Sequence, residues 1–234
     1  MVSLERRLVA EAIGTSFLLI AVVGSGILGE RLANGNTAIA LLANALATGA
    51  ALYTLIEWFT PISGAHFNPL VTAAMAYRGD IKSTVAAAYV VVQLLGAVMG
   101  VAIANIMFDG PIFSLSVHSR NGASQLLSEF VSTFGLLGAV WVCTLKRPAA
   151  SASVVAAYIG GGFWFTATGF ANPALTLARA FTDTFSGIRL VDVPGFIAAQ
   201  SAGALAAVIV FRWLVPRGDH AKEKTIVVPR QDDL

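Results

Sequence analysis

Charged residues are scarce in this chain. Asp, Glu, Lys and Arg make up 12% of its 234 residues, about half of the share that is usual in soluble proteins. Hydrophobic residues make up 56%, and the mean hydropathy is +0.76. This composition excludes an ordinary soluble domain and places the chain among membrane proteins. The net charge of +2 is small, and the absence of a basic run gives no reason to expect a nucleic-acid partner.

Cysteine and histidine are scarce as well. Cys143 is the single cysteine, so the chain has no internal disulfide and no cysteine spacing typical of a metal site. Because Cys143 lies in an apolar run, we expect an inert thiol that is buried or faces lipid. The sequence offers no cluster of nucleophile, base and metal ligands. We therefore expect no enzyme, and no catalytic residue, cofactor or metal.

Long apolar runs are abundant instead. Six of them have about 20 residues, the length that crosses a hydrocarbon core of ~30 Å. They cover residues 8–28, 37–56, 82–106, 123–145, 152–168 and 193–214, and turn-forming or polar residues separate them. The predicted fold class is an all-α membrane protein with six transmembrane helices. Residues 216–234 are charged and poor in apolar residues, which predicts a short disordered tail.

Two shorter helices are predicted where Asn precedes Pro, at Asn68-Pro69 and Asn172-Pro173. Asn is a preferred N-cap because its side-chain oxygen accepts an unpaired backbone N–H. Proline is favoured at the first helical position, where its missing N–H is not needed. The apolar run behind each pair lasts about nine residues, or ~13–14 Å, which is half of a hydrocarbon core. Two such half-helices that meet tip to tip would make one full crossing.

The two halves of the chain repeat each other. The segment that begins at Glu11 matches the one that begins at Glu129, the two Asn-Pro pairs match, and Gln93 matches Gln200. Because each half has three spans, the second half must be inserted upside down. Such an inverted repeat places its functional site near the middle of the membrane. We assign repeat one to residues 4–107 and repeat two to residues 123–215, within one membrane domain over residues 1–215.

Positive charges are distributed unevenly between the two sides of these spans. Most Lys and Arg residues fall in the segments on the side of both termini; the exceptions are Arg31, Arg120, Arg179 and Arg189. The positive-inside rule therefore predicts that both termini are cytoplasmic.

These motifs together resemble those of the major intrinsic protein family, the aquaporins and aquaglyceroporins. The resemblance covers about residues 4–215 and rests on Ala10-Glu-Ala-Ile-Gly-Thr15, Ser63-Gly-Ala-His-Phe-Asn-Pro-Leu-Val-Thr72 and Phe170-Ala-Asn-Pro-Ala174. It implies the aquaporin fold, with six spans and two re-entrant half-helices in an inverted 3+3 repeat. It also implies a homotetramer in the lipid bilayer, with one pore per subunit and passive flow of water or small neutral solutes.

The two motif asparagines are the first candidate pore residues. Their cap oxygens serve the backbone, and we expect each amide NH2 to be free to hold a passing water or hydroxyl oxygen. The positive helix ends behind them would repel protons and other cations. The alternative is that they are ordinary caps of buried helices. The motif residues are Asn68, Pro69, Leu70, Asn172, Pro173 and Ala174, with Leu70 where the family usually has Ala, and in the family the carbonyls of Gly64, Ala65 and His66 line the pore.

Two glutamates lie inside predicted spans, where a carboxylate needs partners. By resemblance, Glu11 and Glu129 accept N–H groups from the irregular backbone that precedes each half-helix, since such backbone is tolerated at membrane depth only when it is satisfied within the protein. A proton relay is the alternative. Gln93 and Gln200 are expected to form hydrogen bonds between helices.

The resemblance places the selectivity filter at Thr48, Gly160, Gly169 and Leu175. Water-selective members usually have an aromatic residue, a His, a small residue and an Arg there, and glycerol channels usually have two aromatics, a Gly and an Arg. Here the four positions hold neither aromatics nor Arg, so we expect a wide filter that passes bulkier neutral solutes. Arg179 follows one helical turn later on the same face, where long side chains lean back toward the helix start; we expect an outer-rim or structural role, and a reach toward the mouth is the alternative.

This filter pattern also resembles a bacterial subgroup that is associated with arsenic resistance. It implies a channel of the bacterial inner membrane for glycerol-like polyols, arsenite as As(OH)3, methylated arsenicals and water. A water-selective pore is the alternative within channels. A proton-coupled secondary transporter shares inverted repeats and broken helices, but it needs coupling-ion ligands at the midplane, and only Glu11 and Glu129 are candidates.

Overall fold

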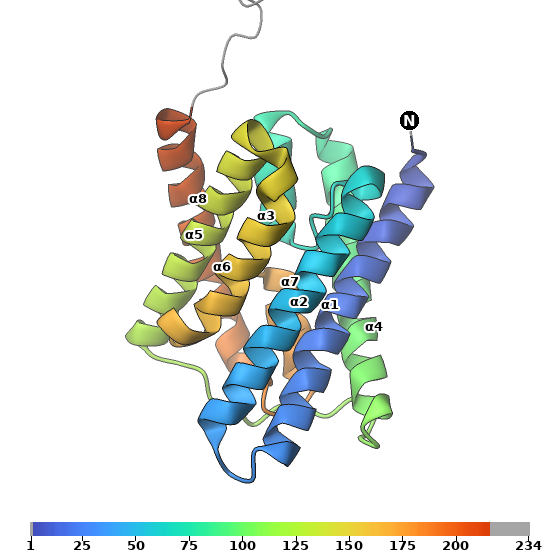
Figure 1. Cartoon of the computed structure of the whole chain (residues 1–234), viewed down its shortest axis with the longest axis vertical. Helices are drawn as coiled ribbons and strands as arrows, with labels where there is room; N and C mark the ends of the chain where they lie inside the picture. Colours follow the sequence, from blue (N-terminus) through green and yellow to red (C-terminus); the bar gives the residue numbers. More distant parts are fainter. Residues whose placement is uncertain (1, 216–234) are drawn as a thin grey trace, which may run out of the picture.

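The computed structural model describes residues 2–215, so the predicted tail over residues 216–234 lies outside the described residues. The helices run along the long axis of one bundle, and the N-terminus and the C-terminal end of α8 lie at the same end of it (Figure 1). We refer to this end as the inner end and to the opposite one as the outer end.

The elements follow one another in two matching sets. The first half contains α1 (Leu4–Leu32), α2 (Thr37–Ser63), α3 (Pro69–Arg78) and α4 (Ser83–Met107). The second half contains α5 (Ala123–Lys146), α6 (Ser151–Phe165), α7 (Pro173–Ala178) and α8 (Val193–Leu214). Three short 3-10 turns join the second set: η1 (Pro148–Ala150), η2 (Arg179–Phe181) and η3 (Leu190–Asp192).

Five helices of the described chain are long and apolar enough to cross a membrane, namely α1, α2, α4, α5 and α8. The predicted fifth span, residues 152–168, is shorter than expected. It corresponds to α6, whose 15 residues span ~22 Å. The helix ends at Phe165 because Thr166 takes an extended conformation, with φ −121° and ψ 160°, and the chain turns inward toward the second half-helix.

The half-helices α3 and α7 begin at their expected caps. The Asn68 side chain accepts the Leu70 N–H, and the Asn172 side chain accepts the N–H groups of Ala174 and Leu175. The helix α3 has 10 residues, whereas α7 has 6 and continues as the 3-10 turn η2. Both begin inside the bundle, and each fills part of one crossing.

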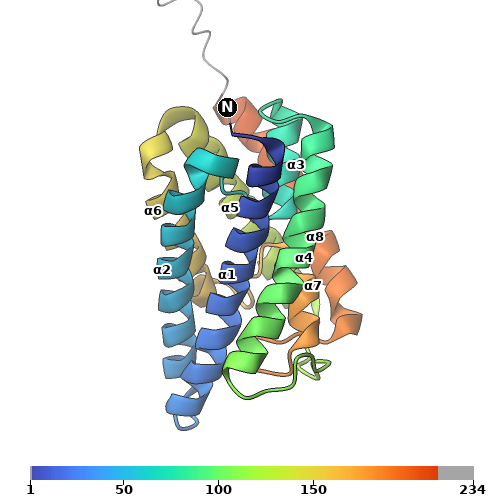
Figure 2. The same ribbon diagram turned by 90° about the vertical axis from the view of Figure 1, so that its right-hand side faces the viewer.

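The packing of the two halves is equivalent. The helix α1 packs against α2 and α4, and α5 packs against α6 and α8; Figure 2 shows α1 between α2 and α4. A Cβ atom at Gly96 would clash with the Ala12 carbonyl, and one at Gly203 would clash with the Phe130 carbonyl. In both halves the helices approach closely at a glycine that lies three residues after the buried Gln. The repeated Gln-x-x-Gly segment therefore marks a contact between helices.

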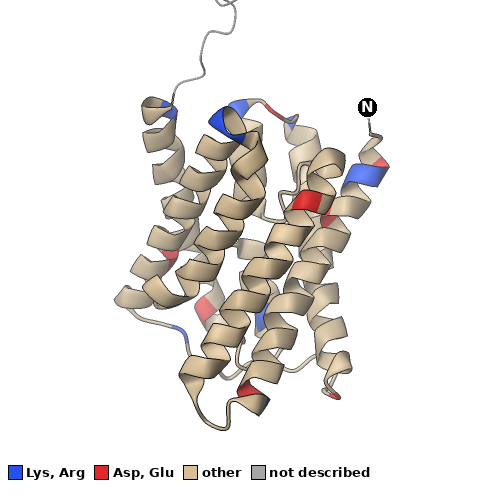
Figure 3. Ribbon diagram, viewed as in Figure 1, with Lys and Arg blue, Asp and Glu red and all other residues tan. Residues whose placement is uncertain are grey.

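Charge is distributed as a membrane requires. Figure 3 shows charged residues at both ends of the bundle and a few within it, while most of the helical surface carries no charge. Large apolar side chains, including Leu95, Leu205 and Trp213, are exposed on the outside. In a bilayer these side chains would face lipid or a neighbouring subunit rather than water.

Candidate functional site

The first re-entrant loop is held by a carboxylate with no exposed surface. Oε1 of Glu11 accepts the Ser63 hydroxyl at 2.6 Å and the His66 N–H at 3.0 Å. Its Oε2 accepts the Phe67 N–H at 2.8 Å and the Gln93 amide at 2.9 Å. All four acceptor directions are therefore used on the loop and on α4, which is the arrangement that makes a buried charge tolerable.

The second loop is held in the same way. Oε1 of Glu129 accepts the Thr168 hydroxyl at 2.5 Å and the Phe170 N–H at 2.8 Å. Its Oε2 accepts the Ala171 N–H at 3.0 Å and the Gln200 amide at 2.6 Å. Gln93 and Gln200 each also donate to a threonine hydroxyl of the adjacent half-helix, Thr72 or Thr176. Each buried glutamine thus ties a carboxylate and a half-helix to the following span.

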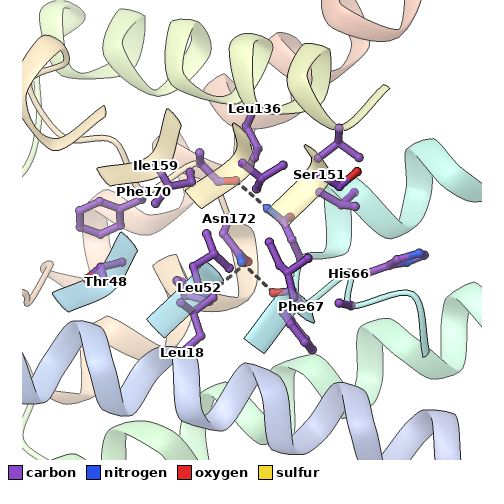
Figure 4. A pocket seen from close by; sticks show the side chains of 18 of the residues that line it. Leu18, Thr48, Leu52, His66, Phe67, Leu136, Ser151, Ile159, Phe170 and Asn172 are labelled. Carbon is purple, nitrogen blue, oxygen red and sulfur yellow. Dashed lines mark hydrogen bonds between the residues drawn. The ribbon is translucent and has the colours of Figure 1, made fainter. Parts of the chain in front are cut away.

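The two half-helices are joined at their tips. The Asn68 amide donates to the Ala171 carbonyl, and the Asn172 amide donates to the Phe67 carbonyl, both at 2.8 Å. Figure 4 shows the Asn172 amide turned toward Phe67. Each NH2 group is therefore not fully free, in contrast to the prediction, because one of its two hydrogens is bonded to the opposite loop. The accepting carbonyls belong to Phe67 and Ala171, and both residues have a strained backbone with φ +49°.

A cavity of about 230 Å³ runs past both asparagines. Its wall includes stripes at four-residue spacing, the spacing at which one face of a helix recurs. On α2 the stripe consists of Thr48, Leu52, Ile56 and Thr60. The stripe on α6 consists of Ser151, Val155, Ile159 and Phe163. Since α2 and α6 run in opposite directions, the cavity extends from Thr48 and Phe163 toward the outer end to Thr60 and Ser151 toward the inner end, over ~18 Å along α2.

The inner half of the cavity contains the first loop. Gly64, Ala65 and His66 line it, and Gly64 and Ala65 have positive φ angles of 93° and 53°. The His66 ring contacts the Thr72 hydroxyl through Nδ1 at 3.1 Å and meets the Tyr89 ring edge-on. In Figure 4 the His66 side chain points away from Asn172. Its ring therefore supports the loop.

The outer half of the cavity contains a guanidinium. Arg179 lines the cavity and is 5% exposed. Its Cζ lies 3.4 Å from the centre of the Phe170 ring, and its Nε donates to the Ser186 carbonyl. Of the two roles considered for Arg179, its place in the cavity wall favours the one at the mouth, and it comes from the 3-10 turn η2 that continues α7. Thr48 also lines the cavity, and its buried hydroxyl has no hydrogen-bond partner in the described chain.

The four expected filter positions do not all share this wall. Thr48, Gly169 and Leu175 line the cavity, but Gly160 does not. A Cβ atom at Gly160 would contact the Ala45 carbonyl and the Cα of Gly49, so this glycine serves the close crossing of α6 over α2. Phe163, a turn later, lines the cavity in its place, and together with Phe170 it makes the outer half aromatic.

Some residues of the site carry no sequence motif. Tyr89 donates to the Ser63 carbonyl at 2.9 Å and accepts from Arg7 at 2.8 Å, which fixes the start of the first loop. In the second half, Arg120 donates to the carbonyls of Gly187 and Phe185 and lies 5.2 Å from the Phe170 ring. Burial lowers the pKa of Arg120, yet an arginine stays charged in proteins. Of these residues, Tyr89 alone has a signal in the sequence: it lies four residues before Gln93, on the same face of a helix.

Comparison with known proteins gives consistent results. The model of the family described as major intrinsic protein matches residues 1–169. Aquaglyceroporin AqpS of Rhizobium meliloti (strain 1021) is 47% identical over 213 residues, 91% of this chain and 91% of that protein. Nodulin-26 of Glycine max is 32% identical over 88% of this chain and 76% of its own length. The solved aquaglyceroporin of Plasmodium falciparum aligns with a TM-score of 0.71 at 22% identity, over 89% of this chain and 96% of that one; it shares the fold.

Proposed function

The chain belongs to the major intrinsic protein family, and on this premise we propose that its cavity is a passive path for small neutral solutes: glycerol-like polyols, As(OH)3, methylated arsenicals and water. The family and its relatives make the chain a membrane channel for small solutes. The observation that carries the finer proposal is the cavity that passes both asparagine tips and reaches toward both ends of the bundle.

The charges around the cavity favour neutral solutes. Among the described residues that line it, Arg179 is the single Lys or Arg, and none is Asp or Glu. Its positive charge and the N-terminal ends of α3 and α7 oppose the entry of cations. The carboxylates of Glu11 and Glu129 are engaged with the loops, so no described carboxylate in this wall is placed to couple a proton or sodium gradient to transport. These features favour a channel over a secondary transporter.

The lining suits a polyol or an arsenic hydroxide. As(OH)3 carries three hydroxyl groups on a small neutral centre, as glycerol does on its carbon chain. Trivalent arsenic binds thiols tightly, and Cys143, the only cysteine, is buried outside the cavity lining. The sulfur that does line it belongs to Met75, a thioether and a weak acceptor. A trivalent arsenic solute would therefore meet no thiol on its way.

We propose a filter in which Phe163 takes the place of the expected Gly160. It consists of Thr48, Phe163, Gly169, Leu175 and Arg179, all of which line the cavity. Leu175 occupies the position where related channels usually carry Arg, and Arg179 supplies a guanidinium from one turn further along. Because this guanidinium is stacked on Phe170, it leaves Leu175 as the apolar part of the wall. This combination would favour solutes with apolar groups, such as methylated arsenicals.

The assembly follows the family pattern in our proposal. We place the chain in the bacterial inner membrane as a homotetramer with a pore in each subunit and with both termini in the cytoplasm. The shared position of the N-terminus and the end of α8 supports a common side for both ends. Exposed apolar side chains on the outer faces of α4 and α8 support contact with lipid or with another subunit.

A solute panel on purified protein in liposomes tests this function. Stopped-flow light scattering would measure water, glycerol and erythritol permeability, and arsenic inside filtered vesicles would measure uptake of As(OH)3 and methylarsenicals. We expect all of these solutes to enter faster than into protein-free vesicles, without saturation and without dependence on a proton gradient.

The matched control is Leu205→Ala, a change on the exposed face of α8, which should leave every permeability unchanged. Water flux without polyol or arsenic flux would identify a water-selective pore instead. Solute flux that saturates and collapses with the proton gradient would indicate a transporter.

A further inference from the structure

The half-helix α3 ends at the inner end with a buried arginine that no motif singles out. Gly79 follows Arg78 with φ 82°, and the Asp80 N–H bonds back to the Met75 carbonyl at 2.9 Å. This reversal is typical of a helix C-terminus that ends in a left-handed glycine. It brings the Asp80 carboxylate onto the guanidinium, whose Nε donates to Oδ2 at 2.6 Å.

The rest of the guanidinium contacts two different elements. Its Nη1 donates to the Thr144 hydroxyl of α5 at 2.8 Å, and its Nη2 lies 2.9 Å from the Met75 sulfur of α3. Its Cζ lies 5.1 Å from the ring centre of Trp141. The Arg78 side chain is only 6% exposed. Charge-assisted bonds in such a place are stronger than those between neutral groups, so Arg78 is held firmly.

Two of the partners of Arg78 are pore-lining residues. Met75 and Thr144 line the cavity, whereas Arg78 itself does not. Both lie near the ends of their helices at the inner end, because α3 ends at Arg78 and α5 ends at Lys146. The Thr144 hydroxyl donates to the Val140 carbonyl at 2.7 Å, so its oxygen is oriented to accept from Arg78. Arg78 thus lies outside the cavity lining and connects the wall formed by α3 to the wall formed by α5.

We propose that Arg78 is a positioning residue that sets the width of the inner mouth by holding the Met75 side chain against the wall. Methionine is unbranched and has three rotatable bonds, so it adapts readily to a gap. Without the guanidinium, its thioether would turn into the lumen beside Thr144. The inner mouth is then a second point of size selection, separate from the filter residues at the outer half. This inference rests on the proposed channel function.

The chain offers a matched control at the same end. Arg212 of α8 donates to the Tyr77 hydroxyl at 2.5 Å, and its Cζ lies 6.0 Å from the Tyr77 ring centre. Like Arg78, it joins α3 to a helix of the other half. Neither Arg212 nor Tyr77 lines the cavity. A change at Arg212 removes an inner-end arginine without touching the pore wall.

The experiment compares Arg78→Met, Arg212→Met, Met75→Ala and the double variant Arg78→Met/Met75→Ala in liposomes, with water, glycerol and erythritol as probes. In Arg78→Met we expect the ratio of erythritol to water permeability to fall at least about threefold, because the larger solute is more sensitive to pore radius. Glycerol should fall less. The double variant should restore the ratio, Met75→Ala alone should raise it above wild type, and Arg212→Met should leave it unchanged.

The remaining outcomes would contradict the role of Arg78, the role of Met75 or the channel function. An unchanged ratio in a folded Arg78→Met protein, or no recovery in the double variant, would overturn the role of Arg78. If Arg78→Met does not fold, Met75→Ala still tests the proposal. An unchanged ratio of erythritol to water permeability in Met75→Ala would mean that Met75 does not limit the inner mouth. Wild-type vesicles that pass neither water nor polyol above protein-free vesicles would reject the channel function itself.

Discussion

The two re-entrant loops share a supporting frame and differ in almost everything that surrounds it. In both, a buried glutamate accepts two loop N–H groups, a hydroxyl and a glutamine amide. In both, the asparagine caps a half-helix and donates across to the other loop. The frame is what the repeat retains, because an irregular loop inside a membrane must satisfy its own backbone.

Different residues surround the two loops. The first loop meets His66, Tyr89 and Arg7, which contact one another or the loop through hydrogen bonds and ring edges. The equivalent part of the second loop has Phe170 stacked by Arg179 and Phe196 in edge contact. Both ends therefore combine hydrogen bonds with ring contacts, but the arginine of the first end lies over Tyr89, outside the loop, whereas Arg179 lies over Phe170 of the second loop itself. The two halves thus keep the same frame with different residues around it.

The largest expected effect comes from the frame itself. Glu11→Gln and Glu129→Gln each replace one acceptor oxygen by an NH2 group that faces donors. Leaving such buried donors unpaired should lower the free energy of unfolding by about 3 kcal/mol in either variant. Thermal unfolding of the purified protein in detergent would measure it, with the exposed Glu5→Gln on α1 as the control. A large effect in one variant alone would break the equivalence of the two loops.

The next effect is expected at the outer mouth. Leu175→Arg places a second guanidinium one turn from Arg179 in the cavity wall, so it should narrow the pore and lower glycerol and erythritol flux at least about tenfold. Liposome permeability would measure it, with Leu175→Met as a control of similar volume. Unchanged polyol flux would place the filter elsewhere.

A smaller effect is expected from removing the existing guanidinium. Arg179→Met keeps an unbranched side chain but loses the cation over Phe170, a contact that contributes ~1–2 kcal/mol when desolvated. We expect a modest loss of thermal stability, higher erythritol permeability and a measurable proton leak, detected with a pH-sensitive dye inside vesicles. The control is Arg189→Met, whose side chain is paired with Asp192. A variant as proton-tight as wild type would show that the half-helix ends suffice.

The smallest effect concerns the residues that precede the two glutamines by one turn. Tyr89→Phe removes a hydroxyl that bonds Ser63 and Arg7, and it makes this position like Phe196 in the other half. The cost should be about 1 kcal/mol, measured as a shift in unfolding midpoint. In Phe196→Tyr the added hydroxyl enters a fully buried apolar cluster and should also destabilise. A neutral result in both would mean that the two surroundings are interchangeable.

Most of the fold could be predicted from the sequence because the signals for it were periodic or duplicated. Apolar run length set the spans, and Asn before Pro set the starts of α3 and α7. The duplicated glutamates and glutamines pointed to contacts of the same kind in each half. Such inferences need only local pattern and symmetry, which is why they reach the correct elements without any knowledge of their surroundings.

Side-chain directions in the outer half needed the structure. Gly160 has no side chain, so its face depends on where Gly49 brings α2 close to α6. The direction of Arg179 depends on Phe170 and on the Ser186 carbonyl of a later loop. The end of α6 at Phe165 depends on Thr166 turning to an extended conformation. None of these features leaves a periodic trace in the sequence.

The reciprocal bonds from Asn68 to Ala171 and from Asn172 to Phe67 make each half incomplete alone. A polypeptide consisting of one repeat would carry a donor whose acceptor resides on a different molecule. Only a second copy threaded through the bilayer in the opposite direction would supply it. A protein of half this length would thus have to insert in both orientations and dimerise to form the same pair of bonds.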